Sequence, residues 1–168
     1  MPIIVDGMAR LLVVHHSPTR GVRALLDAAV EGARDDAIEG VEVRVVAALE
    51  PDAQDVLDAD GYLLMTPANF GYMSGALKHF FDTVFLQAGG SLGEDGAAAE
   101  SAGRPKPYGL LVHGRYDTTG AVRSVQSIVQ ALSWRQAAEV VQAIGDVDEE
   151  HRAQARELGA TLAALLMD

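Results

Sequence analysis

The chain has 168 residues, 13 basic and 24 acidic residues for a net charge of −11, and no cysteine. This length fits one domain, so we expect residues 1–168 to fold as a single unit. The lack of cysteine excludes disulfides, thiolate catalysis and iron–sulfur clusters, and it suits a cytoplasmic protein. The negative charge disfavours nucleic acid and anionic membranes as partners, and no apolar run reaches the roughly 18 residues of a membrane span.

Apolar residues alternate between strand-like and helix-like spacing along the chain. Strands are predicted at residues 11–14, 41–46, 62–65, 108–112 and 137–143, the last with helix as an alternative. Helices are predicted at residues 22–33, 52–58, 74–85 and 122–132, followed by a final helix lined by leucines between residues 158 and 166. Residues 1–8 are predicted to be an N-terminal extension. Residues 87–106, which include five glycines, are predicted to be a mobile loop.

The repeated strand–helix alternation predicts an α/β fold, because continuous apolar strands are typical of a parallel sheet covered by helices on both faces. Two strand orders are common for such a five-stranded sheet: a dinucleotide-binding order and the order 2-1-3-4-5. In the second order, strands 1, 3 and 4 are neighbours, and ligands bind where these strands end.

Three segments that follow these strands differ in charge from the rest of the chain. Residues 15–23, 66–79 and 113–123 contain five basic residues and one acidic residue, a net charge of +4, which leaves −15 elsewhere. With the order 2-1-3-4-5, the three segments are expected to meet at one crevice.

The first segment joins a strand to a helix, where free backbone N–H groups and the helix dipole favour an anion. Ser17 and Thr19 add hydroxyl groups and Arg20 adds a positive charge. These residues predict a phosphate site in the context of the other two segments. Taken alone, they fit an ordinary helix N-cap beside an exposed arginine.

The other two segments combine turn residues with aromatic side chains. Phe70, Tyr72 and Met73 offer apolar surfaces to a flat aromatic ligand. Alternatively, these side chains fill the end of the sheet or lie in an oligomer interface. His113 ends a strand, where it serves either in proton transfer or as a hydrogen-bonded structural residue. Tyr116 either flanks a ligand or faces solvent.

Other chemistries find less support. A metal site made of His15, His16 and His113 is disfavoured, because adjacent histidines on a strand point to opposite faces. A G-x-S-x-G pattern at residues 89–93 lacks the preceding strand and following helix that a nucleophile elbow needs. Neither a G-x-G-x-x-G nor a Walker A pattern is present.

Residues 58–82, with the run T-P-A-N-F-G-Y-M-S-G-A-L-K-H-F-F-D at their end, closely resemble the flavin-loop segment of flavodoxin-like NAD(P)H:quinone oxidoreductases and FMN reductases. The other segments follow the same order over nearly the whole chain, as in small actinobacterial-type members. The resemblance implies a three-layer flavodoxin-like fold, bound FMN, NAD(P)H as electron donor and a quinone or similar acceptor. It also implies a homodimer or larger homo-oligomer.

The resemblance assigns three groups of residues to FMN. The phosphate loop is Ser17, Thr19, Arg20, Gly21 and Val22; the first ring loop is Pro67, Ala68, Asn69, Phe70, Gly71 and Tyr72; the second ring loop is His113, Gly114 and Tyr116. His113 is the candidate proton donor. Arg20, Gly21 and Val22 depart from the usual S/T-x-T-G-N-T pattern, which removes phosphate contacts. The acidic surface leaves a non-enzymatic flavodoxin-type electron carrier as one alternative, and the altered phosphate loop leaves a flavin-free binding domain on the same fold as another.

Overall fold

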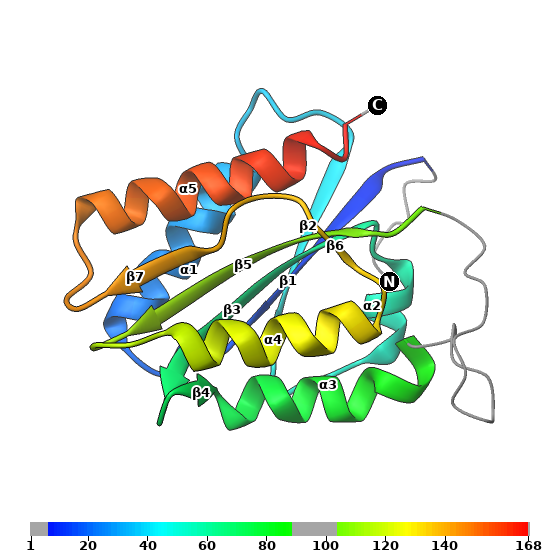
Figure 1. Ribbon diagram of the computed structural model, residues 1–168. Helices are drawn as coiled ribbons and strands as arrows, with labels where there is room; N and C mark the ends of the chain where they lie inside the picture. Colours follow the sequence, from blue (N-terminus) through cyan, green and yellow to red (C-terminus); the bar gives the residue numbers. More distant parts are fainter. Residues whose placement is uncertain (1–6, 89–103, 168) are drawn as a thin grey trace.

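Seven strands and five helices are found in residues 7–88 and 104–167, the part of the chain that the computed structural model describes (Figure 1). In chain order they are β1 (Ala9–His15), α1 (Arg20–Ala33), β2 (Val41–Ala47), α2 (Ala53–Asp58), β3 (Gly61–Asn69), β4 (Tyr72–Met73), α3 (Gly75–Ala88), β5 (Pro107–Gly114), α4 (Thr119–Ala131), β6 (Arg135–Gln136), β7 (Val141–Ile144) and α5 (Glu149–Ala164). Most of the predicted N-terminal extension and mobile loop lies outside the described residues. Residues 87 and 88 of that predicted loop instead end α3.

The strands form one sheet in the order β2-β1-β3-β5-β6, with β7 also paired to β5. All these pairs are parallel, which confirms the predicted α/β fold and the flavodoxin-like order 2-1-3-4-5. The short β4 pairs antiparallel with β3 and was not predicted.

The predicted fifth strand, residues 137–143, is wrong as a continuous element. Tyr108 of β5 pairs with Gln136 of β6, and Leu111 of β5 pairs with Val141 of β7. Only two residues lie between Tyr108 and Leu111 on β5, whereas four lie between Gln136 and Val141 on the neighbouring edge segment. The edge chain therefore leaves the sheet between β6 and β7.

Helices cover both faces of the sheet, with α1 and α5 on one face and α2, α3 and α4 on the other (Figure 1). Leu11 and Val13 of β1 pack in the apolar cluster under α1 and α5. Leu12 and Val14, which point the opposite way, pack in the cluster under α3 and α4. Because both faces are covered, residues 11–14 in the middle of β1 are all apolar, as the sequence pattern indicated.

The apolar face of α3 is used inside the domain. Leu77, Phe80, Phe81 and Val84 are at most 2% exposed and pack against the sheet. Ser74 caps this helix as predicted, because its Oγ accepts a hydrogen bond from the N–H of Leu77 (3.2 Å). The α3 residues therefore give no independent support to a homodimer, which stays a prediction that light scattering can check. None of the described helices is long and apolar enough to span a bilayer.

Helices α1 and α5 approach so closely that only glycine fits at their crossing. A β-carbon on Gly159 would overlap the carbonyl oxygen of Ala29, and one on Gly32 would overlap that of Arg156. Each helix thus contributes one glycine that lets the backbone of the other come near. This contact holds α5 against the C-terminal half of α1.

We predict that Gly159→Ala destabilises the protein by about 2 to 3 kcal/mol, because backbone atoms cannot yield to the added methyl group as a side chain can. Urea unfolding followed by circular dichroism measures the change. Gly75→Ala is the control, since a β-carbon there meets nothing within 4 Å; we expect a change within about 0.5 kcal/mol. Equal effects of the two substitutions would contradict close packing at Gly159.

Candidate functional site

The ends of β1, β3 and β5 bring the three predicted segments to one edge of the sheet. His15 of β1 is level with Met65 of β3, and Pro67 of β3 is level with His113 of β5. Neighbouring strands lie about 4.8 Å apart, so the segments after β1 and β5 begin roughly 10 Å apart on either side of β3. The predicted convergence is confirmed.

The segment after β1 has the features of an anion site. The side chain of Thr19 caps α1 by accepting a hydrogen bond from the N–H of Val22 (3.3 Å). The N–H groups of Arg20 and Gly21 lie in the first turn, where a helix offers them no acceptor of its own. No acidic residue occupies that turn. The positive end of the helix dipole is therefore not compensated locally.

Val22 lies in the core rather than in the site. Its side chain is 1% exposed, and its N–H is already bonded to Thr19. A valine at this position is thus explained by packing, whereas the threonine of the usual pattern would place a hydroxyl there. Of the five residues predicted for the phosphate loop, Val22 has neither side chain nor N–H available to a ligand.

A contact between His15 and Ser17 was missed by the sequence interpretation. The Nδ1 atom of His15 lies 3.0 Å from the Oγ atom of Ser17. Burial, with a further contribution from Arg23, lowers the pKa of His15 below its usual value. The two residues are two apart in the sequence, but only the bend after β1 aims their side chains at one another. Among the described residues, no group of three or more His, Asp or Glu side chains is arranged to hold a metal ion.

The segment after Met65 is a hairpin rather than a loop. Strand β3 continues through Asn69, which pairs with Tyr72 of β4. Phe70 and Gly71 form the two-residue turn with φ angles of 51° and 74°. Positive φ at both positions is what a tight hairpin turn of this twist requires, and it costs a non-glycine residue such as Phe70 strain energy.

The hairpin separates the side chains predicted for the first ring loop into buried and exposed groups. Pro67 is buried in β3 and Ala68 is partly buried, whereas Asn69, Phe70, Gly71 and Tyr72 are exposed. Phe70 is fully exposed, so it does not fill the end of the sheet. Met73, at 2% exposed, does pack in the core.

The second ring loop is tied to the segment that follows β7. His113 donates a hydrogen bond from Nε2 to the carbonyl oxygen of Gly145 (2.8 Å), since a carbonyl only accepts. Arg115 pairs with Asp146 (2.7 Å) and holds the pKa of that carboxyl below its usual value. Tyr116 is 85% exposed. The positive charge of Arg115 is thus matched by a residue that lies outside the three segments.

The pairing of Arg115 leaves most of the unpaired positive charge of the three segments beside α1, with Arg123 of α4 as the third cation that has no side-chain partner among the described residues. Lys78 pairs with Asp82 along α3 (2.6 Å), so its charge is also neutralised by an acidic residue outside the three segments. In the described part of the chain, Arg20 and Arg23 form no side-chain hydrogen bond or ion pair. Both follow β1, where the first turn of α1 favours an anion.

The two ring loops touch one another through glycine. A β-carbon on Gly120, in the first turn of α4, would overlap the carbonyl oxygen of Gly71 at the hairpin tip. A β-carbon on Gly114 would lie 2.8 Å from Cγ2 of Thr118 and 3.3 Å from Cβ of Ala68. The N–H of Met73 donates to Oγ of Ser124 on α4 (3.3 Å). The hairpin therefore rests on α4 rather than standing free.

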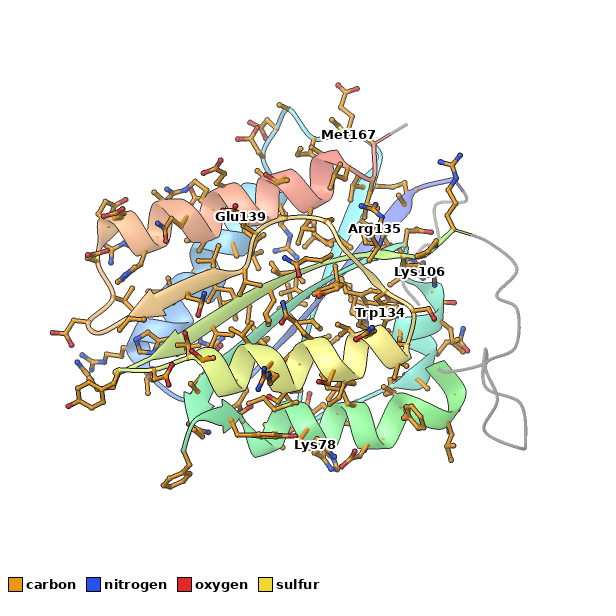
Figure 2. All side chains as sticks on the ribbon, viewed as in Figure 1. Lys78, Lys106, Trp134, Arg135, Glu139 and Met167 are labelled. Carbon is orange, nitrogen blue, oxygen red and sulfur yellow. The ribbon has the colours of Figure 1, made fainter. Side chains whose placement is uncertain are left out.

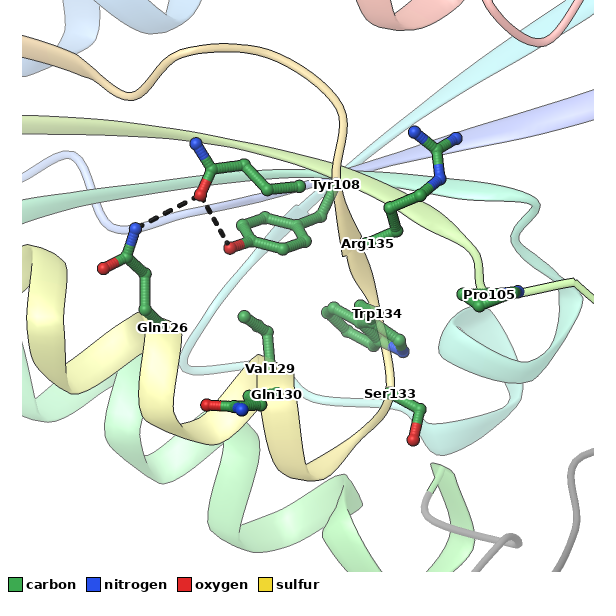
Figure 3. Close-up of a pocket in the computed structure, with 9 residues that line it drawn as sticks. Pro105, Tyr108, Gln126, Val129, Gln130, Ser133, Trp134 and Arg135 are labelled. Carbon is green, nitrogen blue, oxygen red and sulfur yellow. Dashed lines mark hydrogen bonds between the residues drawn. The ribbon is translucent and has the colours of Figure 1, made fainter.

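A separate hollow of about 550 Å³ lies at the opposite, amino-terminal edge of the sheet. Tyr108 and Gln126 both donate to Oε1 of Gln136 there, at 3.4 Å and 3.2 Å (Figure 3). Trp134 stacks on Tyr62 with ring centroids 3.7 Å apart. Trp134 lies near Arg135 and Lys106, at the far end of the sheet from the three segments (Figure 2). The hollow is therefore not part of the candidate site, and its hydrogen bonds attach β6 to β5 and α4.

We predict that Gly120→Ala displaces the hairpin, because the new methyl group meets the backbone of Gly71. Amide resonances of residues 69–73 in a two-dimensional NMR spectrum should shift, and the free energy of unfolding should fall by about 1 to 3 kcal/mol. The matched variant Gly75→Ala should leave those resonances in place. Unchanged hairpin resonances in Gly120→Ala would show that the tip does not rest on α4.

No protein-family model matches the chain. Two curated proteins are similar to it: a flavodoxin of Aquifex aeolicus, 35% identical over 97 residues, and an NAD(P)H dehydrogenase (quinone) of Acidithiobacillus ferrooxidans, 29% identical over 130 residues. The matches cover 57% and 67% of this chain but only 51% and 62% of the two relatives.

The solved structure of a flavodoxin from the domain Archaea superimposes on this fold with a TM-score of 0.74 at 12% identity. The match covers 94% of this chain and 98% of the archaeal chain. Sequence similarity and strand order thus agree with the resemblance seen in residues 58–82. The chain has a flavodoxin-like fold.

Proposed function

We propose that the chain binds FMN at the carboxyl edge of its sheet and acts as an NAD(P)H-dependent oxidoreductase toward quinones or similar acceptors. The observation that carries this proposal is the meeting of an anion-binding helix start with two exposed aromatic loops. The names of the two curated relatives, a flavodoxin and a quinone dehydrogenase, point the same way.

The phosphate of FMN fits the segment after β1. Thr19 uses its oxygen to cap α1, which leaves its hydroxyl proton to donate outward. The N–H groups of Arg20 and Gly21 add two further donors. Arg20 occupies the position where the family pattern has glycine. Its positive charge compensates for the phosphate contacts that this chain lacks because Gly21 and Val22 replace the asparagine and threonine of the pattern. The cradle is thus altered but complete enough to hold a dianion.

The proposed binding mode places the flat ring against the exposed aromatic side chains of the two ring loops. Phe70 and Tyr116 expose their aromatic side chains on loops that follow neighbouring strands. Bound flavin would supply the redox chemistry, taking electrons from NAD(P)H and passing them to the acceptor. The role of the chain is to bind and orient the ring. The Nε2–H of His113 is held by Gly145, so a proton delivered by His113 would leave from Nδ1.

An electron carrier without enzymatic activity is the second candidate. A net charge of −11 suits docking to a basic redox partner, and one curated relative is a flavodoxin. A flavin-free binding domain is the third candidate, since three positions of the phosphate loop depart from the family pattern.

The purified protein with added FMN, NADH or NADPH, and a quinone distinguishes these candidates. Oxidation of the nicotinamide that depends on both FMN and quinone supports the oxidoreductase. Tight FMN binding without turnover supports the carrier. A colourless protein that does not bind added FMN supports the binding domain and contradicts our proposal.

We predict that the double variant Ser17→Ala, Arg20→Ala binds FMN at least tenfold more weakly, while riboflavin affinity barely changes. A charge-assisted hydrogen bond contributes about 1.5 to 3 kcal/mol, and about 1.4 kcal/mol corresponds to a factor of ten in Kd. Neither substitution removes the Thr19 cap. Fluorescence titration with both ligands measures the ratio.

Arg135→Ala is the matched control, because it removes an exposed arginine at the amino edge of the sheet. It should leave both affinities unchanged. Equal affinities of the unmodified protein for FMN and riboflavin would show that no phosphate cradle exists.

A further inference from the structure

We infer that His15 is a positioning residue for the bound phosphate: it sets the direction of the Ser17 hydroxyl, and phosphate binding is accompanied by proton uptake at His15. The inference rests on the proposed function, because it concerns the same phosphate loop. It stands on the 3.0 Å contact between His15 Nδ1 and Ser17 Oγ.

The contact has two hydrogen arrangements with opposite consequences for an anion. When Nδ1 carries no hydrogen, it accepts the hydroxyl hydrogen of Ser17, and that hydroxyl turns only lone pairs toward a ligand. When Nδ1 carries a hydrogen, it donates to Oγ, and the hydroxyl hydrogen of Ser17 is free to bond a phosphate oxygen. A bound phosphate therefore favours the Nδ1–H arrangement.

The phosphate also favours the positive charge of a doubly protonated His15. A phosphate oxygen bonded to Ser17 Oγ lies within about 6 Å of His15 Nδ1, because the two hydrogen bonds share one atom. An opposite charge at such a distance raises a histidine pKa by about one to three pH units. The charged form is thus selected over a neutral ring with its hydrogen on Nδ1.

Without a ligand, the surroundings of His15 oppose its charge. Burial has the largest effect, Arg23 and His16 add like charges, and only Asp27 favours protonation. The residues level with His15 on the neighbouring strands, Ala47 of β2 and Met65 of β3, carry no charge. The pKa of His15 is therefore below its usual value, and the ring is neutral near pH 7 until an anion arrives.

The sign of the pH dependence follows from this difference. Bound phosphate raises the pKa of His15 above that of the free protein. The contribution of His15 to affinity is full below the free pKa and is lost as the pH rises through the bound pKa. Riboflavin, which has no phosphate, should show no such dependence.

Calorimetric titration of FMN at pH 7 in two buffers of different ionisation enthalpy measures the protons taken up. We expect uptake of ~0.3 proton or more per FMN by the unmodified protein and by His16→Gln, and much less by His15→Gln. Riboflavin should give none. Equal uptake by His15→Gln, or equal uptake with riboflavin, would overturn the inference while leaving FMN binding intact.

A second measurement needs neither a variant nor flavin. NMR titration of the histidine ring protons gives the pKa of His15 with and without inorganic phosphate, with chloride at equal ionic strength as reference. We expect phosphate to raise this pKa by about one pH unit or more. No rise would overturn the inference even if FMN binds. A rise with no FMN binding would instead support His15 and contradict the proposed function.

Discussion

The enclosure of β3 on all sides fixes the position of the candidate site. Residues 61–67 are buried on both faces, and β1 and β5 pair with its two edges in parallel. A shift of one residue in either pairing would turn apolar side chains from one packed face to the other. The end of β1 is therefore held level with Met65 of β3, and His113 near the end of β5 is held level with Pro67. This register places the starts of the three loops side by side at the carboxyl edge of the sheet, and the loops therefore meet there.

Secondary contacts then set the shape that each loop takes beyond the sheet. The carbonyl oxygen of Gly71 packs against Gly120, where no β-carbon could fit, so the hairpin contacts α4. A β-carbon on Gly21 would lie 3.0 Å from Val147, so the start of α1 is close to the segment after β7. His113 bonds that same segment through Gly145. Each loop is thus braced by a neighbour, and the site is shaped by backbone contacts as much as by the side chains that face a ligand.

Patterns that depend on burial were readable from the sequence, whereas those that depend on tertiary pairing were not. Apolar runs predicted β1, β3 and β5, because strands covered on both faces are largely apolar. The strand order was one of two common orders, and the family resemblance favoured it. The break between β6 and β7 was not predicted, because it arises from unequal spacing against β5. The pair Arg115–Asp146 joins residues 31 apart, so charge counting by segment overestimated the free positive charge. Val22 lies in the core, although the family pattern placed it in the phosphate loop.

In the proposed phosphate loop, the residues that depart from the family pattern would change how an anion is recognised as well as how strongly it binds. A cradle of backbone N–H groups is fixed in charge, so its affinity depends little on pH. In the proposed site Val22 contributes no donor, and the compensating groups would be the exposed Arg20 and the Ser17 hydroxyl, whose direction we infer that His15 sets. Exposed charges are screened by salt, and a histidine titrates near neutrality. Recognition carried by these groups depends on ionic strength and on protons, so a flavin held here would be retained or released according to the solution around it.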